Sequence, residues 1–357
     1  MRMLVACKAF LLLLLIGMIV PCVSWAKVWK AGYLQAGDYW SYSATTAAIF
    51  DSLSAMSRSK YLGWHDSVVI AEGARLSPGW DNKEGLKEAA KELLARADLD
   101  IILSAGTGAT AALIEASKDS PRKTPIVAFA VTDAIASGFV ASETDSGMDN
   151  LTVRLVPGWY KRMFEVFHEV VGFRRLGIMY PDTVDGRRYS NVEEAREVAA
   201  AAGFELVEYS GIGPAEDAVE CQKGLNYLYA KGIDAFFIGP LLCFDWKQSD
   251  VKSLLGSMVE HDVASFAREG TPFVRSGALL GFSTSDYSGR GRFSAEQVVR
   301  ILQGAKPRSL PMVDNDIPKI SFNLAVAEDI GYDPPFDLLA ASDEVFQTIS
   351  LPSESGQ

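Results

Sequence analysis

The sequence predicts an α/β fold made of two similar lobes, each a parallel sheet covered by helices. Apolar, strand-like runs alternate with amphipathic, helix-like runs along most of the chain. Such alternation is typical of βαβ units, which build parallel sheets with helices on their faces. The alternation occurs twice, with a break at residues 149–159 ("DNLTVRLVPGW"), so two lobes are expected in succession.

The first cycle begins close to the amino terminus and ends before this break. Its segments alternate between strand-like and helix-like, starting with a strand: residues 27–35, 45–56, 66–73, 83–96, 98–106, 108–118 and 124–133. Ligands of open parallel sheets bind beyond the carboxyl ends of the strands. The carboxyl ends in two facing lobes should therefore line a cleft.

The second cycle repeats the same alternation after the break. Again starting with a strand, its segments are residues 174–182, 191–203, 204–211, 221–232, 233–241, 250–262, 278–285 and 294–307. The chain is long enough for two cores, since a single core rarely grows beyond about 250–300 residues.

The first 26 residues resemble a secretory signal peptide. Two positive charges precede a leucine-rich run, and Ser24-Trp25-Ala26 forms a small-x-small cleavage site. A permanent membrane anchor is the alternative, but Pro21 and the cleavage site argue against it. Lipidation at Cys22 is disfavoured because Pro21 stands where a small residue is expected. We expect an exported, periplasmic protein that begins near Lys27.

Charge and cysteine content limit the possible partners. The formal net charge is −11, and it becomes −13 when the two positive charges of residues 1–26 are removed. An acidic surface disfavours nucleic acid and anionic lipid as partners. Outside the first 26 residues the cysteines are Cys221 and Cys243, which could pair in an oxidising compartment or remain two buried thiols. The three histidines are scattered, so neither a catalytic zinc nor a cofactor is expected.

A glycine-rich loop follows the third strand-like segment. Residues 102–117 read "ILSAGTGATAALIEAS", the strand, turn and helix order of an anion-binding loop. The loop lacks the Gly-Lys-Ser/Thr of a Walker motif and the third glycine of a dinucleotide fingerprint. A helix N-terminus with a threonine hydroxyl remains, which suits a small polar or anionic group. Alternatively, the glycines serve only the geometry of the turn.

Several segments resemble one family of exported ABC-transporter substrate-binding proteins, the group that includes tryptophan- and tyrosine-linked members. They are "TPIVAFAVTDAIASGFVAS", "DNLTVR", "RRLGIMYPD", "GALLGFSTSDYSGRGRFSAEQVVRILQGAKPRSLPM" and "PKISFNLAVAEDIGYDPPFDLLAASDEV". The segments occur in the family's order and span most of residues 100–345. No single motif is diagnostic, but their order behind a signal peptide is specific.

The resemblance implies a type I periplasmic binding protein, with two Rossmann-like lobes, a multi-strand hinge and closure on a small solute. It places residues 27–152 and 279–312 in lobe one and residues 153–278 and 313–345 in lobe two, with a flexible tail at 346–357. It also implies a monomer that delivers an amino acid or similar small carboxylate to the membrane permease of an ABC importer. A membrane sensor is an alternative partner. An exported enzyme is less favoured, because no Gly-x-Ser-x-Gly or Cys-His signature is present.

The resemblance also places residues of lobe one at the cleft. The predicted ligand-binding residues of this lobe are Gln35, Tyr39, Trp40, Tyr42, Gly106, Thr107, Gly108, Thr132 and Asp133. The aromatic residues in "GDYWSYS" depart from the family pattern and would provide a stacking wall for the ligand. Alternatively, Trp40 and Tyr42 pack beneath the loop, and Asp133 caps the following turn.

In lobe two the resemblance points to Tyr180, Asp185 and Arg268. Asp185 could pair with a ligand ammonium or remain a solvated loop residue. Arg268 is a cation at the cleft edge that could bind a carboxylate with both arms of its guanidinium. The alternative for Arg268 is a salt bridge to Glu269 or across the hinge.

Overall fold

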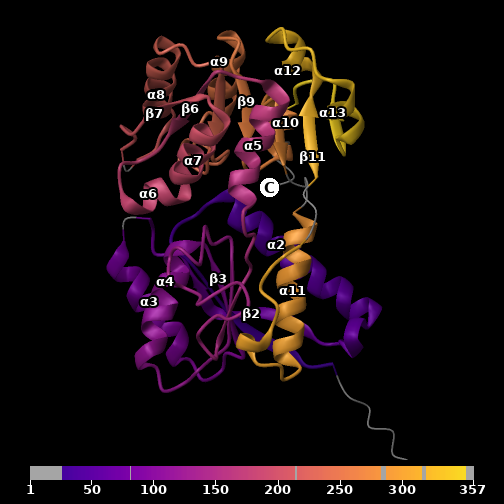
Figure 1. Ribbon diagram of the computed structural model, residues 1–357. Coiled ribbons are helices and arrows are strands. Elements are labelled where there is room, and N and C mark those ends of the chain that lie inside the picture. Colours follow the sequence, from indigo (N-terminus) through magenta and orange to yellow (C-terminus); the bar gives the residue numbers. More distant parts are fainter. Residues whose placement is uncertain (1–25, 81, 214, 283–286, 316–318, 351–357) are drawn as a thin grey trace, which may run out of the picture.

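The computed structural model describes all residues except 1–25, 81, 214, 283–286, 316–318 and 351–357. The predicted signal peptide, including Cys22, therefore falls almost entirely outside the described residues. Figure 1 shows two lobes, one above the other, with segments of the chain passing between them. The α/β fold with two parallel-dominated sheets is confirmed. None of the helices within the described ranges is long and apolar enough to cross a membrane.

Lobe one is built on a sheet whose strands, among the described residues, have the order β2-β1-β3-β4-β5. All of its strand pairs are parallel. The strands are β1 (Val28–Gln35), β2 (Ser67–Leu76), β3 (Ile101–Ala105), β4 (Ile126–Phe129) and β5 (Leu151–Val153). The helices of this lobe are α2 (Trp40–Ser59), η1 (Tyr61–Gly63), α3 (Lys83–Ala95), α4 (Thr107–Asp119), α11 (Ser288–Leu302) and η3 (Pro307–Ser309).

Lobe two contains the larger sheet, with the strand order β12-β11-β10-β9-β8-β6-β7 in the part of the chain that is described. Its pairs are parallel except for β10 with β11. The strands are β6 (Arg175–Met179), β7 (Glu205–Tyr209), β8 (Ala235–Ile238), β9 (Ala264–Ala267), β10 (Leu280–Phe282), β11 (Ile320–Asn323) and β12 (Glu344–Phe346). The helices are α5 (Trp159–Val171), α6 (Val184–Tyr189), α7 (Val192–Ala202), α8 (Ala218–Ala230), η2 (Leu242–Phe244), α9 (Val251–Glu260), α10 (Thr271–Ser276), α12 (Leu324–Asp329) and α13 (Phe336–Ala341).

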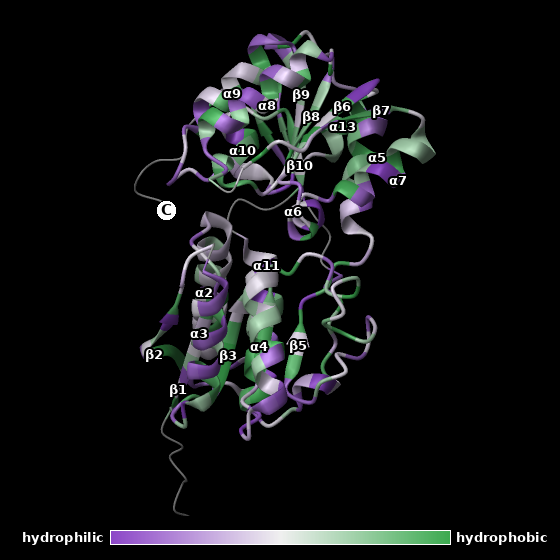
Figure 2. Ribbon diagram, turned by 90° about the vertical axis from the view of Figure 1, so that its left-hand side faces the viewer, coloured by the Kyte–Doolittle hydropathy of each residue, from purple (hydrophilic) through white to green (hydrophobic). Residues whose placement is uncertain are grey.

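Each sheet has a hydrophobic core on both faces. In lobe one, α2 and α11 cover one face and α3 and α4 the other. In lobe two, α5 and α7 lie over one face, and α8, α9 and α10 over the other. Figure 2 shows hydrophobic residues concentrated in the strands and hydrophilic residues on the outward parts of the helices. Burial on both faces explains why strands such as β3 are continuously apolar in sequence.

Strand β10 requires a correction to the expected lobe boundary at residue 279. It pairs with β9 and β11, so it belongs to lobe two rather than lobe one. The physical reason is the short connection: β9, α10 and β10 form one βαβ unit, and α10 places β10 beside β9. The chain returns to lobe one only after Phe282.

The lobes are joined by neighbouring segments of the chain. Leu155, which follows β5, forms a parallel bridge with Val313 on the segment that leads to β11. The Leu155 N–H donates to the Met312 carbonyl (2.9 Å), and the Asp314 N–H donates to the Leu155 carbonyl (2.9 Å). Beside this bridge, Arg154 and Asp314 form an ion pair of 2.6 Å. These contacts support the expected multi-strand hinge.

Two further features concern the cysteines and the C-terminal segment. Cys221 and Cys243 form a disulfide, which decides between the two alternatives left by the sequence.

Residues 346–350 were expected in a flexible tail, but Phe346 ends β12, and the Ser350 N–H donates to the Arg275 carbonyl (2.9 Å). This part of the expected tail is therefore attached to α10, because its backbone finds partners there.

Candidate functional site

A cavity of about 1200 Å³ lies between the lobes. Lobe one contributes the starts of α2 and α4 and the segment after β4. Lobe two contributes the start of α5, helix α6, and residues that follow β7, β8 and β9. Sheet register explains the lobe-one side: Gln35 is paired with Ala105, and Ala105 with Phe129, so β1, β3 and β4 end together. The cavity is therefore at the carboxyl ends of the strands, as expected for this fold.

The start of α4 forms one side of the cavity. Gly106 has φ = 85° and precedes the helix without a side-chain cap. A Cβ atom added at Gly106 would lie 2.2 Å from the Tyr42 hydroxyl oxygen, so a side chain could not be added without movement. The Thr107 hydroxyl accepts a hydrogen bond from the Thr132 N–H (3.2 Å), which uses only an oxygen lone pair. The hydroxyl proton and the first N–H groups of α4 can therefore face a ligand.

Aromatic side chains at the start of α2 form a second wall. The rings of Tyr39 and Tyr42 meet edge to face with their centroids 5.4 Å apart. Burial is the main cause that raises the pKa of both phenols, so both hydroxyls are neutral at physiological pH. The buried Tyr39 hydroxyl has no hydrogen-bond partner among the described residues. Such a group needs a partner, which a water molecule or ligand would supply.

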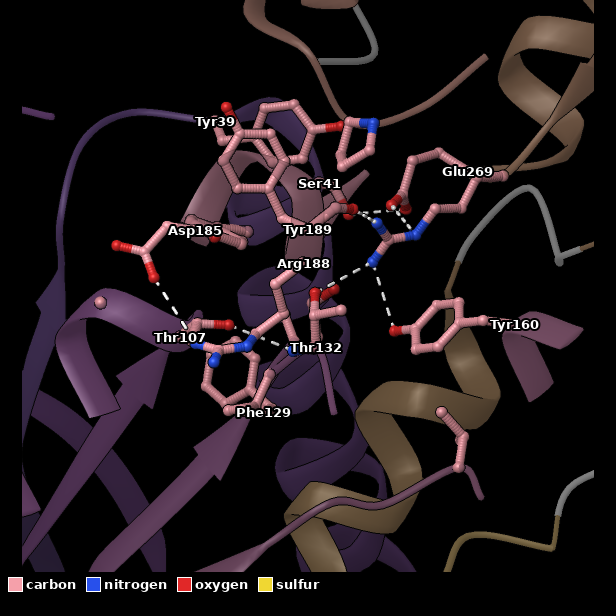
Figure 3. A pocket seen from close by; sticks show the side chains of 18 of the residues that line it. Tyr39, Ser41, Thr107, Phe129, Thr132, Tyr160, Asp185, Arg188, Tyr189 and Glu269 are labelled. Carbon is pink, nitrogen blue, oxygen red and sulfur yellow. Dashed lines mark hydrogen bonds and ion pairs between the residues drawn. The ribbon is translucent and has the colours of Figure 1, made fainter. Parts of the chain in front are cut away.

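Arg268 reaches across the cavity from the end of β9. Its Nη2 donates to the Thr132 hydroxyl of lobe one (3.3 Å) and to the Tyr160 hydroxyl (3.2 Å), and its Nη1 donates to the Tyr189 carbonyl. The guanidinium also lies 4.7 Å from the centre of the Tyr160 ring. Figure 3 shows Thr132, Tyr160 and Glu269 close to one another at this place. Only 9% of the Arg268 side chain is exposed, so its charge is held away from bulk water.

Glu269 lies beside Arg268 and joins the lobes. Its Oε2 is 3.2 Å from Arg290 Nη1 on α11 and accepts a hydrogen bond from the Ser41 hydroxyl (3.0 Å). Its Oε1 is 3.8 Å from Arg268 Nε. Burial alone would raise the pKa of Glu269, but Arg290 and Arg268 outweigh it and hold the pKa below its usual value. Two guanidinium groups thus share one carboxylate, which leaves the cluster with a net positive charge.

A second cation lies at the edge of the cavity on α6. Arg188 Nη1 is 3.5 Å from Asp185 Oδ1, and the Asp185 side chain is 72% exposed. Both residues line the cavity, and Figure 3 shows their side chains directed into it. Next to them, the Tyr189 hydroxyl donates to Glu216, so this part of the wall is tied to the loop after β7.

The structure brings together seven of the predicted site residues around the cavity. They are Tyr39, Tyr42, Thr107, Gly108, Thr132, Asp185 and Arg268. A methyl group added to Gly108 would meet only Ala36 and Leu86 at ordinary contact distances. A small side chain at Gly108 is therefore compatible with the fold, unlike one at Gly106.

Five predicted site residues do not line the cavity, and each has another role. Gln35 is buried and donates to the Asp38 carboxylate and the Ser77 hydroxyl. Trp40 packs on Phe273, with the ring centroids 5.7 Å apart. Gly106 shapes the turn before α4, as described above.

The remaining two are Asp133 and Tyr180. Asp133 Oδ1 accepts the Ala136 N–H (2.9 Å), which is the turn cap considered as its alternative. The Tyr180 hydroxyl donates to Glu208 (2.5 Å), away from the cavity. In each case a partner close in sequence or in the same sheet satisfies the side chain, so none is directed into the cavity.

Several cavity residues were not predicted. They are Ser41, Trp159, Tyr160, Arg188, Tyr189, Glu269 and Arg290. Trp159 and Tyr160 follow the break between the cycles, and two aromatic residues at the start of a helix near a lobe crossing could have indicated them. Arg290 gave no such signal, because its place depends on how α11 packs beside α2.

The described residues contain no group of three or more His, Cys, Asp or Glu side chains that could hold a metal ion. The lining of the cavity offers guanidinium groups, hydroxyls, backbone N–H groups and aromatic rings to a ligand.

Comparisons with known proteins agree with this geometry. A model of the ABC transporter substrate-binding protein family matches residues 79–346. No curated protein matches the sequence. A conserved domain protein from Vibrio cholerae has a similar structure, with a TM-score of 0.68 and 20% identity, covering 89% of this chain and 100% of the other.

Two further solved structures share the fold. An ABC domain in complex with L-Trp from Streptococcus pneumoniae has a TM-score of 0.67 and 18% identity, covering 90% of this chain and all of the other. A periplasmic binding protein type 1 from Bordetella pertussis has a TM-score of 0.52 and 14% identity, covering 85% of this chain and 88% of the other.

Proposed function

This chain belongs to the family of ABC transporter substrate-binding proteins, and from that premise we propose that it captures a small carboxylate, such as an amino acid, between its lobes. Members of this family bind substrates and are not enzymes. The proposed ligand-binding residues are those of the predicted set that line the cavity, together with Tyr160 and Arg188.

The environment of Arg268 is the observation that carries this proposal. Arg268 and Arg290 share the single carboxylate of Glu269, so the buried cluster can accept one more negative charge. A guanidinium binds a carboxylate through two parallel hydrogen bonds, which are stronger than neutral ones. The start of α4 lies beside Thr132, whose hydroxyl is a partner of Arg268. The Thr107 hydroxyl and the free N–H groups of this helix end are therefore on the same side of the cavity as Thr132.

The aromatic wall supports a ligand with an apolar or aromatic body. Tyr39, Tyr42 and Phe129 line the cavity, and Tyr160 lines it in contact with Arg268, the proposed carboxylate-binding residue. The related fold from Streptococcus pneumoniae holds L-Trp. Because a cavity of about 1200 Å³ exceeds the usual range of ligand pockets, about 300–1,000 Å³, we propose that the lobes close further when ligand binds.

Export and delivery complete the proposal. The signal-like first 26 residues support export to the periplasm, with cleavage near Ala26. We propose that the exported protein is a monomer. Delivery to the membrane permease of an ABC importer is supported by the family match. In the closed form, the outer faces of the two lobes would contact the permease.

Binding measurements on Arg268 variants test the proposal. A panel of amino acids and other small carboxylates is screened for a rise in melting temperature, and calorimetry then measures the affinity of each positive ligand. Arg268→Lys should weaken binding at least about tenfold, because an ammonium cannot reproduce the bidentate contact. Arg308→Lys is the matched control, since Arg308 pairs with Asp145 (2.7 Å) outside the cavity. Equal affinities for both variants, or no binding by any carboxylate, would refute the proposed role of the cavity.

A further inference from the structure

Helix α2 begins at the cleft without a cap of its own. The residue before it, Tyr39, is extended and offers no side-chain cap. Instead, the Trp40 N–H donates to the carboxylate of Asp245 (3.0 Å), which follows η2 in lobe two. The first N–H groups of a helix have no partner within it, and the helix end favours a negative charge. The first helix of lobe one is therefore capped by an aspartate of the other lobe.

Gln248 adds a second connection at the same place. Its amide Nε2 donates to Asp245 Oδ2 (3.1 Å) and to the Asp38 carbonyl of lobe one (3.1 Å). Asp245 is only 1% exposed, and its Oδ1 accepts the Lys247 N–H (2.8 Å). We call Asp245 and Gln248, with their lobe-one partners Asp38 and Trp40, the interlobe clasp.

The loop that carries the clasp is anchored firmly in lobe two. Cys243, two residues before Asp245, is joined by the disulfide to Cys221 on α8. The Leu242 N–H donates to Glu216 (2.8 Å), and Phe244 is fully buried. Movement of Asp245 relative to lobe two would require these contacts to break.

The Trp40 ring forms the apolar side of the clasp. The Trp40 ring meets both Phe273 of α10 and Tyr287, which directly precedes α11, with centroid distances of 5.7 Å in each case. Tyr287 belongs to the segment that carries the chain from lobe two back to lobe one. The start of α2 is thus held to lobe two by polar and aromatic contacts beside a crossover segment.

We infer that Asp245 is a positioning residue, which fixes the start of α2 against lobe two and so sets the place of the cleft wall formed by Tyr39, Ser41 and Tyr42. Asp245 does not itself line the cavity. The clasp acts as a pivot that persists while the rest of the cleft opens and closes. The expected effect of Asp245 on ligand affinity rests on the function proposed above. Its expected effect on the geometry between the lobes is independent of that function.

Comparison of two helix-capping aspartates tests this inference. Asp245→Ala removes the cap from the other lobe. Asp250→Ala is the matched control, because Asp250 caps α9 within lobe two by accepting the Ser253 N–H (3.1 Å). Both variants should lower the melting temperature. The distribution of distances between spin labels on Glu92→Cys of α3 and Ala200→Cys of α7, both exposed and away from α9, should become broader only in Asp245→Ala. This distribution is measured without ligand.

Ligand affinity provides the second measurement. Asp245→Ala should weaken binding of the best carboxylate from the panel about fivefold. Asp245→Asn should restore only part of the affinity, since its amide keeps one acceptor oxygen for the Trp40 N–H but turns an NH2 group toward the Lys247 N–H. Asp250→Ala should leave the affinity unchanged. An unchanged label-distance distribution in Asp245→Ala would overturn the inference. If no ligand is found, the distance measurement still decides on the pivot, so failure of the proposed function is distinguished from failure of the inference.

Discussion

Neutralising Glu269 should change protein stability and ligand affinity in opposite directions. Glu269→Gln keeps an acceptor for the Ser41 hydroxyl but removes the negative charge shared by Arg268 and Arg290. The two guanidinium groups would then lie buried without a counter-charge. The empty protein should lose stability, while the cavity should attract a carboxylate more strongly.

The expected magnitudes follow from the geometry. Removing one partner from a buried ion pair lowers the free energy of unfolding by about 3–5 kcal/mol. Because Glu269→Gln retains a hydrogen-bond acceptor, we expect a loss of about 3 kcal/mol. A carboxylate that displaced the Thr132 and Tyr160 hydroxyls from Arg268 would lie roughly 7 Å from Glu269, given the 3.8 Å between Arg268 Nε and Glu269 Oε1 and a further hydrogen bond of about 2.9 Å. At an effective dielectric constant of about 20, removing that repulsion strengthens binding by about 2 kcal/mol, or roughly thirtyfold.

Urea unfolding of the empty protein and calorimetry with the ligand measure the two quantities. Glu208→Gln is the control, because Glu208 also pairs with an arginine of lobe two, at 2.7 Å from Arg196, but outside the cavity. This control should lose no more than about 1 kcal/mol and bind the ligand normally. A Glu269→Gln protein that binds carboxylates more weakly than the wild type would refute the reasoning that the cluster lacks one negative charge.

Three further predictions concern the disulfide, the edge of the cavity and pH. Replacing Cys221 and Cys243 with alanine opens a cross-link that spans 22 residues and should lower the free energy of unfolding by about 3 kcal/mol in urea titrations; a loss under about 1 kcal/mol would contradict this. Asp185→Asn should weaken binding of an amino acid about two- to fivefold in calorimetry and leave its 2-oxo acid analogue unaffected, if Asp185 pairs with the ammonium; equal effects on both ligands would exclude that pairing. Because the pKa of Glu269 is depressed in the folded protein, its contribution to stability is present above the usual glutamate pKa and is lost as the pH falls through the folded value. Acid titration of Glu269→Gln should therefore show a shallower loss of stability than the wild type, and parallel curves would argue against it.

The sequence was sufficient for the fold because strand burial leaves a clear pattern. Strand β3, for example, is fully buried and continuously apolar, and the following Gly106 marks its turn into α4. The residues of β10 alone did not predict which lobe this strand belongs to, since an apolar strand fits either sheet. Its neighbours β9 and β11 decide its place, and one of them follows almost forty residues later in the chain.

The site was predictable only in part, because a residue's place at a strand end does not reveal where its side chain points. Thr107, Thr132 and Arg268 follow parallel strands and meet at the cavity. Asp133 also follows a strand, but its carboxylate binds a nearby backbone N–H instead. Trp40 was predicted to contact the ligand because it is next to Tyr39 in sequence. Successive residues of a helix point in different directions, however, and the Trp40 ring packs on Phe273 of the other lobe. Contacts across lobes, such as that of Glu269 with Arg290, depend on packing between distant segments and leave no local pattern.

The central claim is that the interlobe cavity holds one small carboxylate bound to Arg268. Native mass spectrometry of freshly purified protein, followed by denaturation and identification of any released molecule, tests this claim most directly. The wild type should carry a single small carboxylate that is released on denaturation, and Arg268→Lys purified in parallel should carry much less of it. A released molecule without an acidic group, or equal occupancy of the two proteins, would contradict the account.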